Sequence, residues 1–110
     1  MLALHLFPGA DGESHFERIG PEALSEWAKP GANVVFIAGK PGFTDFHNSG
    51  RPHIAIVLAG KMELTASDGD KQVVGPGDCV FSEDTSGKGH SANVFDGEPF
   101  KVAIVTLAGK

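Results

Sequence analysis

Glycine and proline residues interrupt this sequence so often that only short apolar segments remain between them. The chain has 15 glycines and 7 prolines in 110 residues, and most segments between them have the length of a strand rather than of a helix. This spacing predicts an all-β domain. The one exception is PEALSEWA at residues 21–28, where Pro21 suits the first position of a helix and Pro30 would end it.

A series of strand-like segments follows after residue 30. The segment at 61–67 alternates apolar and polar residues, as expected of a strand with one buried face. SDGD at 67–70 and GPGD at 75–78 have the composition of tight turns. Because no helices separate the strands, antiparallel pairing in a sandwich or a barrel is expected. The predicted strands are residues 33–38, 43–47, 53–59, 61–67, 71–74, 78–82, 90–95 and 100–107.

The length of 110 residues fits a single domain. We expect residues 1–30 to form an N-terminal arm with the short helix, and residues 31–110 to form the β-barrel body. Phe7, Phe16 and Trp27 are too apolar to remain in water, so they cap the barrel or contact a second subunit. The apolar strands at 53–59 and 100–107 favour burial on both faces, which predicts a homodimer.

Composition and charge exclude several classes of protein. The formal net charge is -5, and no basic stripe is present to bind phosphates, so no nucleic-acid partner is expected. No apolar run reaches the roughly 18 residues of a membrane span. Residues 1–10 lack the basic flank of a signal peptide, and the single Cys79 cannot form an intrachain disulfide, so a cytoplasmic protein is predicted. Cys79 lies in an apolar strand, which favours a buried, unreactive thiol.

Three histidines lie at the ends of predicted strands: His47, His53 and His90. If these strands are neighbours in a barrel, their imidazoles converge near its mouth. Three neutral imidazoles form a competent site for a first-row transition metal. Taken singly, each histidine is better explained as a surface or hydrogen-bonded residue at a strand terminus.

The segment EDTSGKGH, residues 83–90, is longer than an ordinary hairpin loop. We expect it to run along the rim of the barrel, with Gly87 and Gly89 allowing close approach of the backbone while His90 points inward. Glu83 or Asp84 would then fix the tautomer of an imidazole or act as a general base. The alternative is a solvated acidic turn.

Two further residues are candidates for binding or surface roles. Arg51 lies between two of the candidate ligands and would clamp a carboxylate of the substrate, or else form an exposed salt bridge. His15 is flanked by acidic residues and is expected on a surface strand.

The order of these features resembles the two motifs of the cupin superfamily. In metal-binding cupins the first motif carries two histidines, a glutamate and a glycine, which correspond to His47, Ser49, His53 and Gly60. The second motif opens with a glycine of the PGD type and ends in a histidine, here His90. The chain departs from the pattern at Ser49, at His53 and in the length of the second loop.

The segments DGESHF, FHNSGRPH, SDGD, GPGD and EDTSGKGH are together similar to small single-domain bacterial cupins of unassigned function. The resemblance implies an antiparallel jelly-roll barrel. It also implies a Zn, Fe, Ni or Mn ion held by His47, His53 and His90, with Ser49 and Arg51 near a small-molecule substrate and Glu83 as the catalytic acid or base. Isomerase, hydrolase or dioxygenase chemistry would follow.

Two other functions remain open at the level of the residues. The chain is either a metal-free module that binds a sugar or an acidic metabolite without turning it over, or a regulatory dimer whose barrel is filled by side chains. Choosing among reactions from the fold alone would be analogy.

Overall fold

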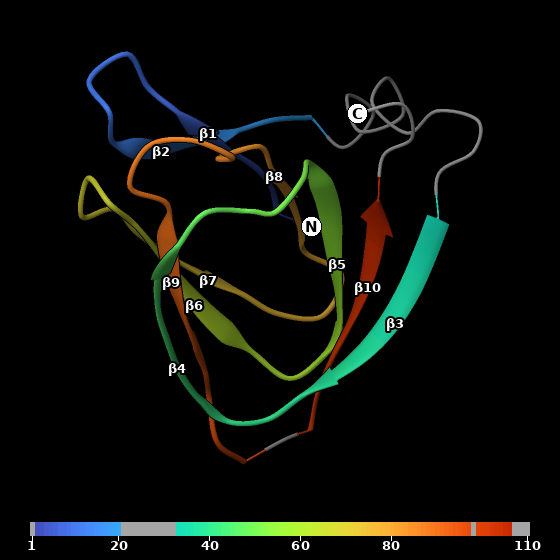
Figure 1. The fold of residues 1–110 in the computed structure, drawn as a ribbon. Helices are drawn as coiled ribbons and strands as arrows, with labels where there is room; N and C mark the ends of the chain where they lie inside the picture. Colours follow the sequence, from blue (N-terminus) through green and yellow to red (C-terminus); the bar gives the residue numbers. More distant parts are fainter. Residues whose placement is uncertain (1, 21–32, 98, 107–110) are drawn as a thin grey trace.

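The computed structural model describes residues 2–20, 33–97 and 99–106. These residues form strands and no helix (Figure 1). None of them belongs to a helix that could cross a membrane. The helix expected at residues 21–28, including Trp27, lies outside the described residues. The strands are β1 (Ala3–Pro8), β2 (Ser14–Arg18), β3 (Asn33–Gly39), β4 (Gly42–His47), β5 (His53–Ala59), β6 (Met62–Ala66), β7 (Lys71–Val74), β8 (Cys79–Ser82), β9 (His90–Val94) and β10 (Phe100–Thr106).

All the strands expected after residue 30 are confirmed as β3 to β10, with described ends that differ by at most one residue. They belong to two sheets, one with the order β2-β1-β8-β5-β10-β3 and one with the order β4-β9-β6-β7. The two sheets face each other across an apolar interior (Figure 1), and no ladder joins β3 to β4 among the described residues. The result is an all-β, jelly-roll type fold that is not closed by hydrogen bonds into a complete barrel.

One pair of strands departs from the expected antiparallel pattern. β1 pairs in parallel with β8, with Leu4 opposite Val80, whereas β1 and β2 form an antiparallel hairpin. Parallel strands need a long connection, and here it is the whole chain between β1 and β8. Part of the segment expected to form an arm therefore contributes two strands to the larger sheet.

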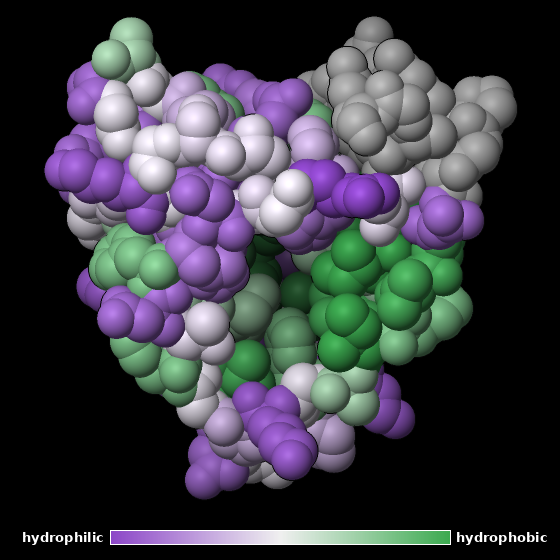
Figure 2. Space-filling view, in the orientation of Figure 1, coloured by the Kyte–Doolittle hydropathy of each residue, from purple (hydrophilic) through white to green (hydrophobic). Residues whose placement is uncertain are grey.

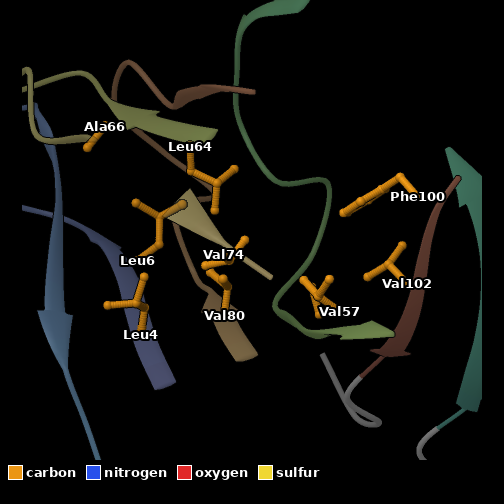
Figure 3. Close-up of a cluster of buried hydrophobic side chains, with 10 residues drawn as sticks. Leu4, Leu6, Val57, Leu64, Ala66, Val74, Val80, Phe100 and Val102 are labelled. Carbon is orange, nitrogen blue, oxygen red and sulfur yellow. The ribbon is translucent and has the colours of Figure 1, made fainter. Parts of the chain in front are cut away.

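The core lies between the two sheets and draws side chains from both (Figure 3). Leu64 and Ala66 of β6 are buried, as the alternation in this segment predicts. Each fully buried valine or leucine side chain stabilises the fold by about 1.5–3 kcal/mol. The buried members of this cluster are Leu4, Leu6, Ala55, Val57, Leu64, Ala66, Val74, Val80, Phe100 and Val102.

Gly60, which the cupin resemblance places at the end of the first motif, makes the turn from β5 to β6. Its φ is 77°, and a Cβ there would lie 2.9 Å from the Cα atom of Phe100 and 2.9 Å from the carbonyl oxygen of Pro99. Only glycine combines this backbone conformation with so close an approach. The turn therefore packs directly against the first residue of β10.

Truncating a core side chain of β1 tests whether this strand is integral to the fold. Leu6 has an exposed fraction of 0%, so Leu6→Ala is expected to lower the free energy of unfolding by about 2–5 kcal/mol. Urea denaturation followed by circular dichroism measures this change. Val73→Ala, at a site that is 48% exposed, is the control and should change it by less than about 0.5 kcal/mol. An equally small effect of Leu6→Ala would contradict this position for β1.

Candidate functional site

A cavity of about 280 Å³ lies between the two sheets, and Figure 2 shows the hollow with hydrophobic side chains inside it. Its walls are apolar and come from both sheets, with Val57 and Val102 on one side and Leu64 and Val94 on the other. The cavity is therefore the part of the jelly-roll interior that core side chains leave unfilled.

The polar part of the lining gathers where four strands begin or end. His53 is the first residue of β5 and His90 the first of β9, whereas His47 ends β4 and Ser82 ends β8. Because these strands are antiparallel neighbours within their sheets, with His53 opposite Ser82 and His47 opposite His90, the four side chains reach the same end of the cavity.

His47 and His90 are close together, with ring centroids 4.6 Å apart and an interplanar angle of 51°. His53 belongs to the other sheet and lines the same cavity. The Nδ1 atoms of His47 and His53 each lie 3.0 Å from a backbone carbonyl oxygen, that of Asp45 and that of Arg51 respectively. Because a carbonyl oxygen only accepts, each Nδ1 donates, which leaves Nε2 with the lone pair in the neutral ring.

His90 is held in the same way, but by a buried carboxylate. Its Nδ1 lies 2.6 Å from Oδ2 of Asp84, whose exposed fraction is 0%. The other carboxylate oxygen of Asp84, Oδ1, accepts a hydrogen bond of 2.7 Å from the hydroxyl of Ser49. An ionised carboxylate in the interior requires such partners. Ser49 therefore positions Asp84, and Asp84 positions the imidazole of His90.

Asp84 and Glu83 are adjacent in sequence but have different environments. Glu83 lies outside the lining of the cavity, and its Oε1 is 2.8 Å from Nε2 of His5. Of the two acids considered in the rim loop, Asp84 is thus the one in contact with an imidazole of the cavity. Arg51 is exposed, and Ser49 is directed to Asp84 rather than to the cavity.

The rim loop EDTSGKGH approaches β4 at Gly89, as expected, whereas Gly87 lies against the β1–β2 hairpin, where a Cβ would be 2.9 Å from the carbonyl oxygen of Gly12. Gly89 has a φ of 77°, and a Cβ there would overlap the carbonyl group of His47, so glycine is required for the loop to pass beside β4. The β1–β2 hairpin holds the loop from outside. The amide of Lys88 donates to the carbonyl oxygen of Gly12 at 3.2 Å. The hydroxyl of Ser14 donates to the carbonyl oxygen of Gly89 at 2.6 Å.

The histidines as placed do not fit a bound metal ion. Within residues 2–20, 33–97 and 99–106, no group of three or more His, Cys, Asp or Glu side chains is arranged to hold one. His53 belongs to the larger sheet whereas His47 and His90 belong to the smaller one, and Ser49, at the position of a ligand in the cupin motif, is engaged with Asp84. All three predicted histidines nevertheless line the same cavity.

Cys79 is buried with an exposed fraction of 4%. Burial, with a smaller contribution from Asp78, raises the pKa of its thiol. The expected burial of Cys79 is confirmed, and because the thiolate is the nucleophilic form, the raised pKa favours the unreactive thiol that the sequence predicts.

His15 lies outside the cavity and joins the β1–β2 hairpin to the turn after β6. Its Nδ1 is 2.8 Å from Oδ2 of Asp68, and its Nε2 is 3.0 Å from Oδ1 of Asp11. The hydrogen bond with Asp11 is the largest cause that raises the pKa of His15, and Asp68 contributes in the same direction. The same contact lowers the pKa of Asp11.

Removing the hydroxyl of Ser49 tests its support of Asp84. Ser49→Ala leaves Oδ1 of a buried carboxylate without its donor, and a hydrogen bond to a charged group contributes about 1.5–3 kcal/mol. The free energy of unfolding, measured by urea denaturation, should fall by about that amount. Ser86→Ala, at an exposed serine of the loop that carries Asp84, is the matched control, and an equal effect of both changes would contradict this role.

The His15 contacts make stability depend on pH. A raised pKa in the folded state gives stabilisation that is complete below the unfolded value and is lost as pH rises through the folded value. His15→Gln should therefore lower the melting temperature more at pH 5.5 than at pH 8.5, as measured by differential scanning calorimetry. Equal losses at the two pH values would show that the charged form of His15 has no part in holding the hairpin.

No protein-family model matches the sequence, and no curated protein matches it either. Several solved structures are similar. The polyketide cyclase RemF from Streptomyces resistomycificus is 23% identical, with 93% of this chain and 69% of that one covered and a TM-score of 0.57. A putative ethanolamine utilization protein Q from Salmonella typhimurium is 13% identical, with 99% and 98% covered and a TM-score of 0.54. The protein NMB1881 from Neisseria meningitidis is 13% identical, with 71% and 76% covered and a TM-score of 0.54.

These structures include cupin-fold proteins of varied or unknown function. Sequence identities of 13–23% show that the folds are similar, but they do not show that the reactions are. Together with the two facing sheets, they establish that the chain has a cupin-type jelly-roll fold.

Proposed function

We propose that the chain binds a small molecule in the cavity between the two sheets, without a resident metal ion. The cavity volume of about 280 Å³ is close to the lower end of the range of about 300–1,000 Å³ typical of ligand pockets. Apolar walls with a few convergent polar groups are also typical of such pockets. A compact ligand is therefore favoured over an extended one.

The polar end of the cavity determines which ligand fits. With each Nδ1 donating away from the cavity, Nε2 of His47, His53 and His90 is a hydrogen-bond acceptor in the neutral ring. A ligand with an apolar body and a hydroxyl group matches this arrangement, because the hydroxyl can donate to Nε2. The apolar walls offer no partners to the several hydroxyls of a sugar, and an ionised acidic metabolite only accepts, so a compact alcohol or phenol fits better than either metal-free ligand considered from the sequence.

One observation carries this proposal: the buried hydrogen bond between Asp84 and His90, 2.6 Å long. It holds the ring of His90 beside that of His47 and leaves its Nε2 as the acceptor at the cavity end. Metal-dependent isomerase, hydrolase or dioxygenase chemistry needs a set of protein ligands, and no group of three or more His, Cys, Asp or Glu side chains among the described residues is arranged as one, so we propose binding rather than metal-dependent turnover. A cytoplasmic location and a bacterial origin stay predictions.

Titration with phenol, followed by NMR of histidine-labelled protein at a pH where the imidazoles are neutral, tests the binding site. Saturable shifts are expected for His47, His53 and His90 and not for His15. His90→Ala removes one hydrogen bond of about 1 kcal/mol, so it should raise the Kd for phenol about five-fold, whereas His15→Ala should leave it unchanged. Shifts confined to His15, or an unchanged Kd in His90→Ala, would contradict a ligand at the histidine end of the cavity.

Elemental analysis of protein purified at neutral pH separates this proposal from the metal-dependent one. A site without a resident ion is expected to carry far less than one Zn, Fe, Ni or Mn per chain. One equivalent that is lost in His90→Ala and retained in His15→Ala would overturn the metal-free proposal, because it would show that the histidines assemble around an ion.

A further inference from the structure

The outer face of the smaller sheet carries a second hollow, of about 370 Å³, which we call the outer hollow. Its lining side chains come from all four strands of this sheet, β4, β9, β6 and β7. Residues that alternate with them along the strands, such as Leu64 and Ala92, line the cavity between the two sheets instead. The outer hollow therefore faces away from that cavity and is separate from the histidine site.

A β-bulge in β4 builds the aromatic side of the outer hollow. The pairing of β4 with β9 shifts between Thr44 and His47, so that two residues of β4 lie opposite one of β9. In a regular strand side chains alternate between the faces, and Phe46 would share the inner face with Thr44. The bulge instead directs Phe46 outward beside Phe43, while His47 lines the inner cavity. The same irregularity therefore shapes both sites.

Two rows of polar side chains form the floor beside these rings. In the strand registers, one row contains Asn93 and Glu63, and the next contains Ser91, Thr65 and Lys71. Among the described residues, these side chains make one hydrogen bond, from Nζ of Lys71 to the hydroxyl of Thr65 at 3.2 Å. The floor therefore presents both donors and acceptors that other protein groups do not use.

The hydroxyl of Ser91 distinguishes the outer hollow from an ordinary solvated face. Ser91 is only 3% exposed, yet within residues 2–20, 33–97 and 99–106 its hydroxyl has no hydrogen-bond partner. Every fully enclosed polar side-chain atom in this part of the chain does have one. The exposed part of Ser91 therefore includes its hydroxyl, which opens into the hollow that Ser91 lines. Buried polar groups are normally hydrogen-bonded, so this hydroxyl favours a polar ligand.

We propose that the outer hollow binds an uncharged pyranose sugar. Each sugar hydroxyl both donates and accepts, and the floor offers a carboxylate that accepts, an ammonium that donates, and amide and hydroxyl groups that do both. The C–H face of the sugar ring is apolar and can pack on the rings of Phe43 and Phe46, which are 65% and 47% exposed. A sugar, which the apolar walls of the inner cavity do not suit, thus finds both kinds of contact here.

A zwitterionic amino acid is the main alternative, because Glu63 and Lys71 carry opposite charges. Its two charged groups would leave the side chains of Asn93 and Ser91 without partners, whereas a sugar has hydroxyls for all of them. The net charge of -5 disfavours an anionic ligand, such as a sugar acid. The inference goes beyond the function proposed for the inner cavity and does not depend on it.

Proton–nitrogen NMR of the backbone amides, in wild-type protein titrated with the methyl glycosides of glucose, galactose and mannose, tests the proposal. With at least one glycoside, saturable shifts are expected at Phe46, Glu63 and Ser91. The proposal is overturned if none of the three glycosides gives saturable shifts there, or if the shifts are confined to residues of the inner cavity. Free phenylalanine is titrated in the same way, and tighter binding of phenylalanine than of every glycoside at these residues would assign the hollow to an amino acid.

Two matched variants then test the aromatic contact. Phe46→Ala is expected to raise the Kd of the bound glycoside about five-fold, because one ring of the stacking surface is lost. Phe36→Ala removes an exposed phenylalanine of β3 that lies outside the outer hollow, and should leave the Kd unchanged. Both side chains are exposed, so the far-ultraviolet circular dichroism spectrum should stay that of the wild type. An unchanged Kd in Phe46→Ala, or the same rise in both variants, would contradict a sugar packed on this ring.

Discussion

The candidate site depends on one buried carboxylate, that of Asp84. A charge in an apolar interior is costly unless it is hydrogen-bonded, and here its two oxygens contact Ser49 and His90. These contacts bring together the loop after β4, the loop after β8 and the first residue of β9. The position of His90 thus follows from the need of the Asp84 carboxylate for hydrogen-bond donors. The burial of Ser49, which lies in a loop, has the same cause.

The jelly-roll arrangement explains why the histidines gather at one end of the cavity. Apart from Thr44 of β4, inward-facing positions within the strands carry apolar side chains and build the walls, whereas the histidines occupy the first or last residue of their strands. The β1–β2 hairpin then holds the rim loop from outside through Gly12 and Ser14. The β1–β2 hairpin is far from His90 in the sequence, yet it restrains the loop that ends at this histidine.

Local patterns were sufficient to predict β3 to β10, because turn residues and alternation act within a few positions. The strand β1 could not be recognised in this way, since it pairs in parallel with β8, some 75 residues later. The contact of Asp84 with His90 was anticipated only as one of two choices, because adjacent residues just after a strand point in different directions. The contact between Ser49 and Asp84 joins residues that are 35 positions apart in the sequence, so local patterns could not reveal it. The cupin motif placed Ser49 at the position of a metal ligand instead.

The central claim is that Asp84 fixes the tautomer of His90 so that Nε2 is the acceptor at the cavity. Long-range proton–nitrogen NMR of the ring nitrogens of His90, in protein held at a pH where the ring is neutral, tests it most directly. The expected result is a protonated Nδ1 and an unprotonated Nε2, with this preference lost in Asp84→Ala. A ring protonated at Nε2, or a tautomer unaffected by the loss of Asp84, would contradict the claim.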